Sequence, residues 1–258
     1  AEEGLEIELI PFKSAMERDA ALQSGSLDGA VSDLLAVIFA RSGGFSVYAT
    51  SYTDGSYNLV AGGNTDIASA ADLRGKEIAI SRNTIIEYVT DEILAVNGVG
   101  EKDVSKVVIP QIPVRLEMLQ SGNLAAAVLP EPMASVAEFS GSRYVTGSGD
   151  LGINPGVIVF TDSAIKDKEQ SIRAMYRAYD KAANYLNNTP RADYIDLIME
   201  RSGFPGPARD ALVLKPYRFA GLPAEKDVDE AVRWVKNKGL AGDYRYDELV
   251  SKLLTEGK

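Results

Sequence analysis

The sequence predicts an α/β fold built of two similar lobes, and a repeated stretch is the main reason. Residues 23–31 read Gln-Ser-Gly-Ser-Leu-Asp-Gly-Ala-Val, and residues 120–128 read Gln-Ser-Gly-Asn-Leu-Ala-Ala-Ala-Val, at a constant offset of 97 positions. In each copy the end of an amphipathic helix meets a glycine that stops it, and a short apolar strand follows. A second observation is that strands alternate with helices as far as residue 160, whereas the pattern after Asp162 is helical only. Two such lobes imply a cleft between them.

The strands are expected where short apolar or alternating runs end at turn residues. The expected strands are Leu5–Ile10, Asp28–Ser32, Phe45–Thr50, Tyr57–Ala61, Glu77–Ile80, Val107–Pro110, Arg143–Thr146 and Val157–Phe160. Because helices separate most of them, we expect a parallel-type sheet in each lobe.

The helices are expected where apolar residues recur at helical spacing behind a capping residue. Ser14 with Glu17 forms a capping box for a helix that ends at Ser24. Asp33 can cap an apolar helix over Leu34–Ala40, and a further helix starts within the polar stretch 81–84. In the helical C-terminal part the clearest patterns cover Ser171–Leu186 and Ala224–Lys238.

Composition excludes several classes of function. The formal net charge of −10 argues against nucleic acid and against anionic membrane surfaces as partners. The 258 residues include no cysteine and no histidine, which removes disulfides, thiol nucleophiles, the usual zinc sites and histidine-based acid–base chemistry. We therefore expect no cofactor and no metal. No run approaches the roughly 20 apolar residues that a membrane span needs.

The first candidate site is the polar stretch that follows the strand Glu77–Ile80. Ligands of α/β sheets bind outside the carboxyl ends of the strands. This stretch consists of Ser81, Arg82, Asn83 and Thr84 and begins a helix, whose first backbone N–H groups lack intrahelical partners. We expect it to receive a polar or anionic group of a ligand. The alternative is that these residues only cap the helix.

Four further residues are candidates by the same rule. Asp33 and Glu131 follow the two repeated strands and could accept hydrogen bonds from an amine, amide or hydroxyl of a ligand. Alternatively, Asp33 is a helix cap and Glu131 a first-turn carboxylate favoured by the helix dipole. Ser14 could line the same cleft or only cap its helix, and Asn154 lies where the chain is expected to return to the first lobe.

Several motifs in order resemble the solute-binding proteins of bacterial ABC importers. They are Gly4–Leu9, the Gln-Ser-Gly-x-Leu-Asp stretch 23–28, Ala71–Lys76, Leu129–Pro132 and Asn154-Pro155, followed by Trp234 and Lys238–Leu240. The resemblance is to the group that includes alkanesulfonate-, taurine- and thiamine-pyrimidine-precursor-binding proteins. It implies the type II periplasmic-binding-protein fold, with lobe two over residues 61–155 and lobe one over residues 1–60 and 156–258, joined by two crossing segments.

The resemblance also implies a way of working. Such a protein closes its lobes around a small polar molecule, sulfonate-like or pyrimidine-like, and delivers it to an ABC permease in the membrane. We expect it to be a monomer and to lie outside the cytoplasm, either free in the periplasm or anchored as a lipoprotein. Family members usually begin with a further strand, loop and helix, so we expect that strand and helix to be missing from this chain.

Two alternative functions remain open at this point. One is an enzyme on the same fold, similar to a thiamine-pyrimidine synthase or a menaquinone-pathway lyase. The other is the effector domain of a transcription regulator, which would need a DNA-binding module. Turnover of a bound compound would indicate the first, and a helix-turn-helix in the full gene would indicate the second.

Overall fold

The chain divides into two compact units. The computed structural model describes residues 3–202, 204–212, 214 and 216–254. Unit 1 comprises Ala1–Asp54, Asn154–Asp193 and Lys215–Lys258, and unit 2 comprises Gly55–Ile153 and Tyr194–Leu214. The chain therefore passes between the units four times, whereas the sequence analysis expected two crossings and assigned residues 194–214 to lobe one. That assignment is wrong because Ala208 lies fully buried in the core of unit 2, where Met199 and Phe204 also pack.

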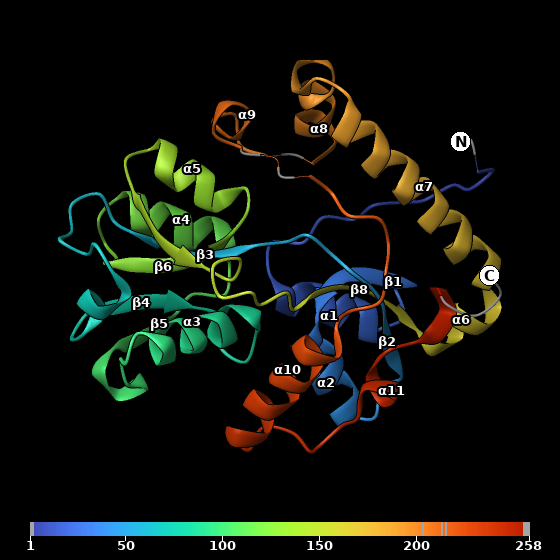
Figure 1. Cartoon of the computed structure of the whole chain (residues 1–258), viewed down its shortest axis with the longest axis horizontal. Helices are drawn as coiled ribbons and strands as arrows, with labels where there is room; N and C mark the ends of the chain where they lie inside the picture. Colours follow the sequence, from blue (N-terminus) through green and yellow to red (C-terminus); the bar gives the residue numbers. More distant parts are fainter. Residues whose placement is uncertain (1–2, 203, 213, 215, 255–258) are drawn as a thin grey trace. The chain divides into compact units, whose positions relative to one another are not determined.

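Unit 2 contains a mixed five-stranded sheet in the order β5-β4-β6-β3-β7. Its strands are β3 (Tyr57–Ala61), β4 (Glu77–Ile80), β5 (Ser105–Val108), β6 (Ala126–Pro130) and β7 (Arg143–Gly147). β4 pairs in parallel with both β5 and β6, and β3 pairs antiparallel with β6 and β7. In Figure 1, α3 lies on one face of this sheet, and α4 and α5 lie on the other. These helices are α3 (Ile85–Val96), α4 (Ile112–Gln120) and α5 (Met133–Phe139).

Unit 1 contains a three-stranded sheet in the order β1-β8-β2. The strands are β1 (Gly29–Asp33), β2 (Val47–Tyr52) and β8 (Gly156–Thr161). Side chains of β8 alternate between the two faces. Ile158 and Phe160 pack against Ala164 of α6 and against Ile172 and Tyr176 of α7. The opposite face, which carries Val159, meets α1 and α2 around a small crevice.

The helices of unit 1 and the C-terminal part follow the sequence prediction in outline. They are α1 (Ala15–Gln23), α2 (Leu34–Ser42), α6 (Asp162–Asp167), α7 (Glu169–Asn188), α10 (Glu225–Asn237) and α11 (Tyr246–Leu249), while α8 (Ile195–Ser202) and α9 (Ala208–Ala211) belong to unit 2. Short 3₁₀ turns lie at Ala70–Leu73, Glu101–Asp103, Arg191–Asp193 and Lys252–Leu254. No strand follows β8 in the part of the chain that the structure describes, as the sequence predicted.

The sequence repeat is a structural repeat. Helices α1 and α4 have the same length and start 97 residues apart, and so do strands β1 and β6. The glycines that stop the two helices, Gly25 and Gly122, have φ of 78° and 76°, a conformation that favours glycine. The two units thus share one helix–turn–strand module.

Two expectations about strands are wrong. The alternating stretch Leu5–Ile10 forms no strand, and Leu9 is 86% exposed. The sequence also predicted a parallel-type sheet in each lobe, whereas both strand pairs of the unit 1 sheet are antiparallel. An alternating pattern gives a face for burial, but a strand forms only where a neighbour accepts its backbone hydrogen bonds.

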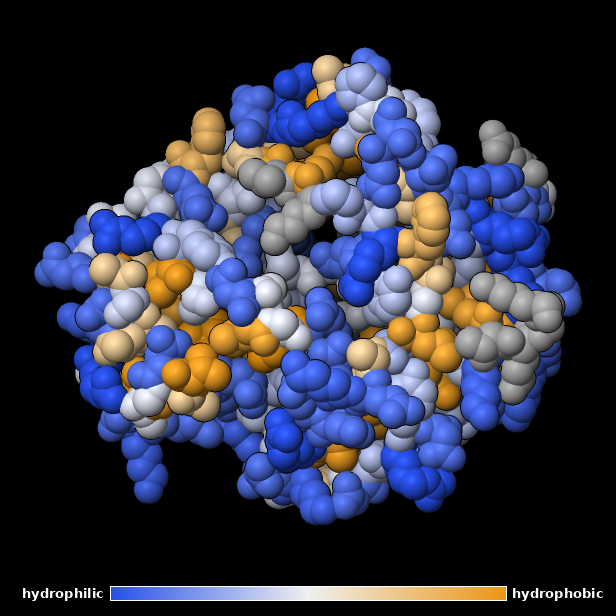
Figure 2. All heavy atoms as spheres, viewed as in Figure 1, coloured by the Kyte–Doolittle hydropathy of each residue, from blue (hydrophilic) through white to orange (hydrophobic). Residues whose placement is uncertain are grey.

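The surface matches the acidic composition. Figure 2 shows hydrophilic residues over most of the face in view, with apolar residues gathered in several patches. None of the helices in the described part of the chain combines the length and the apolar content needed to span a bilayer.

Candidate functional site

The polar loop after β4 is held by the first turn of α3. Thr84 is the N-cap: its Oγ1 accepts a hydrogen bond from the backbone N–H of Ile86 at 3.2 Å and donates to the carbonyl oxygen of Ser81 at 2.7 Å. Asn83 has a φ of 55°, the left-handed region that asparagine tolerates better than most residues. The side chains of Arg82 and Asn83 are exposed, whereas Ser81 is buried.

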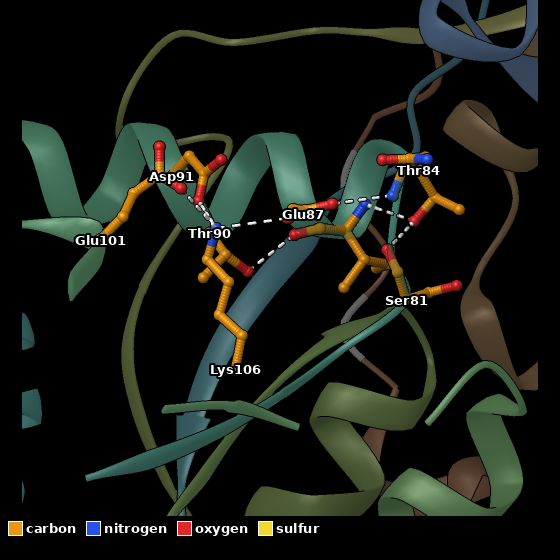
Figure 3. Close-up of polar contacts among 9 residues, drawn as sticks. Ser81, Thr84, Glu87, Thr90, Asp91, Glu101 and Lys106 are labelled. Atoms are coloured by element: carbon orange, nitrogen blue, oxygen red, sulfur yellow. Dashed lines mark hydrogen bonds and ion pairs between the residues drawn. The ribbon is translucent and has the colours of Figure 1, made fainter. Parts of the chain in front are cut away.

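The buried carboxylate of Glu87 bonds to this loop from the first turn of α3, as Figure 3 shows. Glu87 Oε2 accepts the backbone N–H of Asn83 at 2.7 Å, and Glu87 Oε1 lies 3.3 Å from the ammonium of Lys106 on β5. The same ammonium also binds Asp91 and, at 3.1 Å, Glu101. Lys106 therefore holds the carboxylate that holds the loop.

This network corrects part of the sequence prediction. The N–H groups at the start of α3 were expected to be open to a ligand, yet those of Asn83 and Ile86 are bonded within the chain. Glu87 also places a negative charge at the positive end of the helix, which offsets the attraction of an anion there. The side chains of Arg82 and Asn83 remain exposed.

Glu131 lies at the carboxyl end of β6 and is also held by the protein. Its Oε1 accepts a hydrogen bond from the side-chain amide of Asn58 at 2.7 Å, and its Oε2 accepts from the hydroxyl of Ser135 at 2.7 Å and from the Ser135 N–H at 3.2 Å. Glu131 lies two residues before the first residue of α5, so it is not the first-turn residue of the alternative prediction, but its carboxylate does accept the Ser135 N–H at the start of that helix. Because a carboxylate has about four lone-pair sites, Glu131 can still accept a bond from a ligand.

The surroundings of Glu131 are acidic. Burial and, second, the charge of Glu131 raise the pKa of Glu138 above its usual range. Burial, followed by the hydrogen bond to Asp150 and nearby carboxylates, raises the pKa of Tyr144 well above its usual value. Such surroundings favour a ligand group that donates hydrogen bonds or carries positive charge.

The loop after β4 and the Glu131 turn after β6 lie at the same end of the unit 2 sheet. β4 and β6 run in parallel, with Ala79 opposite Ala127, so the loop after β4 and the Glu131 turn after β6 leave at the same end. α/β sheets bind ligands at this end, outside the carboxyl ends of their strands. Ser81, Arg82, Asn83, Thr84 and Glu131 are therefore brought to one end of unit 2, as the topological rule predicted.

The other candidates gather at one end of the unit 1 sheet. Asp33 is the N-cap of α2, with Oδ1 accepting from the Ala36 N–H at 2.9 Å, and its Oδ2 lies 3.4 Å from the guanidinium of Arg18. The backbone N–H of Leu34 donates to the carbonyl oxygen of Pro155, and the exposed Asn154 directly precedes Pro155 in the chain. The Asn154 N–H donates to Asp227 at 3.1 Å.

Ser14 performs the capping role that the sequence offered as an alternative. Its Oγ accepts the backbone N–H of Glu17 at 3.2 Å, and only 6% of the residue is exposed. The Glu17 carboxylate reaches back to the N–H of Lys13, one residue before the cap. Ser14 therefore has little surface left to contact a ligand in this conformation.

One feature escaped the sequence analysis, which took Arg115 for an exposed helix residue. It is 1% exposed, and its Nη1 donates to the Val128 carbonyl oxygen at 2.8 Å. Arg18, its counterpart in the repeat, reaches the carbonyl of Val31 in the same way. The carboxylates that pair with Arg18 are Asp19 and Asp33, and the residues 97 positions later are Leu116 and Pro130. Comparing the two copies residue by residue could have revealed this difference.

The family model described as NMT1/THI5 like matches residues 1–193. The chain belongs to the NMT1/THI5-like family. No curated protein sequence matches the chain. Solved structures with the same fold exist, and the three described next are 12–17% identical to this chain. The alkanesulfonate-binding protein SsuA from Xanthomonas axonopodis pv. citri, bound to MOPS, has a TM-score of 0.79 and 17% identity over 91% of this chain and 83% of that chain.

Two other structures have a similar fold. The ligand-binding component of an ABC-type import system from Staphylococcus aureus, with zinc bound, has a TM-score of 0.80 and 16% identity over 99% of this chain and 89% of that chain. A DszB mutant in complex with biphenyl-2-sulfinic acid has a TM-score of 0.69 and 12% identity over 98% of this chain and 91% of that chain. These likenesses establish the type II periplasmic-binding-protein fold predicted from the sequence.

Proposed function

We propose that this chain is the solute-binding component of an ABC importer, which captures a small polar organic molecule outside the cytoplasm and delivers it to a membrane permease. The family match over residues 1–193 supports the proposal, together with the fold that the chain shares with ABC-import binding proteins. The observation that carries it is the placement of the candidate residues: in each unit they gather at one end of the sheet.

We infer two possible ligand classes from the residues at these ends. The exposed Arg82 and Asn83 suit a sulfonate-like or other anionic group, because a guanidinium and an amide donate several hydrogen bonds. Glu131 and Asp33 suit a pyrimidine-like ligand, because carboxylates accept hydrogen bonds from ring N–H and amino groups. The two ligand classes need opposite charges in the protein: a cation for a sulfonate and carboxylates for a pyrimidine-like ligand.

A binding experiment separates these classes. Native mass spectrometry of the purified protein shows whether a compound co-purifies and whether the protein is the monomer that we propose. Thermal shift with alkanesulfonates, aminopyrimidines and amino acids then identifies the class. A compound at 100 times its Kd adds about 2.7 kcal/mol to stability, which corresponds to a rise in Tm of several degrees.

Two variants test the assignment of residues. Asn83→Gly keeps the left-handed backbone and removes only the side-chain amide. It should therefore weaken the binding of an anionic ligand and leave the Tm of the free protein nearly unchanged. Glu131→Gln keeps the size of the side chain and, with its oxygen toward Ser135, both bonds from that residue, but it loses the bond from Asn58; it should weaken the binding of a pyrimidine-like ligand. A complete absence of binding across the panel and of any co-purified compound would contradict the proposed function.

Similarity to DszB keeps an enzymatic function as the second candidate, since that protein was solved with a sulfinic acid bound. The same samples test it. If the compound is chemically changed when the protein releases it, the chain is an enzyme and the receptor proposal fails. If the compound leaves unchanged, the receptor proposal stands.

A further inference from the structure

The strands β4 and β6 of unit 2 part from each other before either strand ends. Their parallel pairing stops at Ala79 and Ala127. Beyond this point β4 still pairs with β5, where Ile80 lies opposite Val108, and β6 still pairs with β3 as far as Pro130. Each strand thus continues with its other neighbour after the bonds between the two have ceased. A cause other than the end of either strand must therefore separate them.

The next bond in this register would join the carbonyl oxygen of Val128 to the N–H of Ser81. The N–H of Glu131 donates to the carbonyl oxygen of Ser56, on the β3 side. Backbone groups of successive strand residues face opposite sides, so those of Val128, three residues earlier, face β4. The residue opposite Val128 in this register is Ile80, and in a parallel pair the slanted bond comes from the residue after it.

The guanidinium of Arg115 bonds to this acceptor instead. Its Nη1 donates to the Val128 carbonyl oxygen at 2.8 Å, and it reaches the sheet from α4, which covers one of its faces. Arg115 is 1% exposed and Val128 is fully buried, so the bond lies inside unit 2. A side chain from a covering helix therefore takes the place of the N–H that would continue the pairing of β4 with β6.

The stability of the fold gives no reason for an arginine at this position. Within the described residues no carboxylate pairs with Arg115, and its Nε has no hydrogen-bond partner. Its counterpart in the repeat, Arg18, lies 2.7 Å from Asp19 and 3.4 Å from Asp33. An apolar side chain at position 115 would leave the carbonyl to the N–H of Ser81, which satisfies it without burying a charge.

We propose that Arg115 is a positioning residue for the ligand site: it holds β4 and β6 apart at their carboxyl ends and so keeps the loop after β4 open to a ligand. The loop begins at Ser81, so a bond from Ser81 to β6 would draw it toward the Glu131 turn and displace the exposed side chains of Arg82 and Asn83. The role in ligand binding rests on the proposed function, whereas the separation of the strands is a property of the free protein.

Hydrogen exchange at the Ser81 amide tests the separation of the strands without any ligand. In Arg115→Met, and in Arg115→Leu as a second apolar variant, the Val128 carbonyl loses its donor, and an unpaired buried carbonyl is unfavourable. The register offers the Ser81 N–H as the replacement, so exchange at this amide, followed by NMR, should slow about tenfold or more. Arg115→Lys keeps a cationic donor, and Glu117→Met changes an exposed position of α4, so both should keep the parent rate.

Ligand titrations of the full chain test the consequence for the site. Methanesulfonate and the aminopyrimidine cytosine, one probe for each ligand class, are titrated into the parent protein and the same variants. A probe that binds the parent should bind Arg115→Met and Arg115→Leu about tenfold more weakly. Arg115→Lys should keep most of the affinity, because its ammonium can still bond to the Val128 carbonyl oxygen.

Three results would overturn the proposal. The first is unchanged exchange at the Ser81 amide in both apolar variants. The second is slower exchange with undiminished ligand affinity, because the separation of the strands would then have no role in binding. The third is weaker sulfonate binding without slower exchange, since the charge of Arg115 would then act and not its position. If neither probe binds the parent, the failure concerns the proposed function, and the exchange rate still decides whether Arg115 separates the strands.

Discussion

The buried guanidinium of Arg115 leads to a prediction whose sign is unusual. Replacing a buried polar residue normally destabilises a protein, but Arg115→Met should leave unit 2 equally stable or make it more stable. Arg115 is 1% exposed, and in the described part of the chain its Nε has no hydrogen-bond partner. Methionine fills a similar volume and adapts to irregular space.

The magnitude follows from two opposing terms. Burial lowers the pKa of Arg115 to about 10, which corresponds to roughly 3 kcal/mol of lost solvation at about 1.4 kcal/mol per pH unit. Against this stands the hydrogen bond to the Val128 carbonyl oxygen, worth about 1.5–3 kcal/mol for a charged donor. The substitution should therefore change the stability by about 0 to +2 kcal/mol.

Arg18→Met is the matched comparison, because Arg18 occupies the same position of the repeat. Its guanidinium lies 2.7 Å from Asp19 and 3.4 Å from Asp33, which is 2% exposed. Removing the cation leaves these carboxylates without their counter-charge, and breaking a buried ion pair costs about 3–5 kcal/mol. Since Asp33 keeps its bond to the Ala36 N–H, the loss should lie near or below the lower figure.

Urea unfolding followed by circular dichroism, with calorimetry as a second probe, measures both changes. The two units can unfold in separate steps, so each transition must be fitted by itself. The reasoning predicts a loss for Arg18→Met and no loss for Arg115→Met. A loss of more than about 2 kcal/mol for Arg115→Met would refute it, because the hydrogen bond would then outweigh the whole solvation cost.

Three further predictions concern single groups. Lys106→Met should destabilise unit 2 by about 3–5 kcal/mol and speed hydrogen exchange in the loop after β4, because Glu87 loses its cation. The control Lys102→Met replaces an exposed lysine in the turn just before β5 and should have neither effect. Asp33→Ala should cost about 1 kcal/mol more than Asp33→Asn in chemical denaturation, since asparagine can still cap α2; equal losses would exclude the cap as the cause. Burial raises the pKa of Asp19, so its stabilising effect is present at low pH and is lost as the pH rises through the folded-state pKa. Asp19→Asn should therefore gain stability relative to the parent between about pH 3 and pH 7, and a constant difference across that range would contradict this.

Local patterns predicted much of the fold. β3 and β4 have the predicted bounds, and the caps at Ser14 and Asp33 form as expected. The offset of 97 residues predicted that α1 and α4 would match, because a repeat in sequence preserves both the helical period and its stop signal. These features depend on residues that are close together in the chain.

The misses depend on partners far apart in the chain. Leu5–Ile10 has the pattern of a strand but no neighbouring strand, and no local signal reports a missing neighbour. The carboxylate of Glu87 that holds the loop after β4 is bonded in turn by Lys106, which lies 19 residues further along the chain. That the candidate residues bind a ligand stays a prediction. The sequence selects polar residues by their position after a strand, and it does not show which of their hydrogen bonds the protein already uses.

The segment Tyr194–Leu214 has a consequence for the order in which the protein is synthesised. Unit 2 needs this segment, because Ala208 is packed among core residues such as Ala134 and Ala137 of α5. A ribosome completes the strands of unit 2 about 60 residues before Ala208 emerges, so this part of the core stays uncovered during that interval. A chain cut at residue 193, where the family match ends, would keep that surface permanently open and would be prone to aggregate.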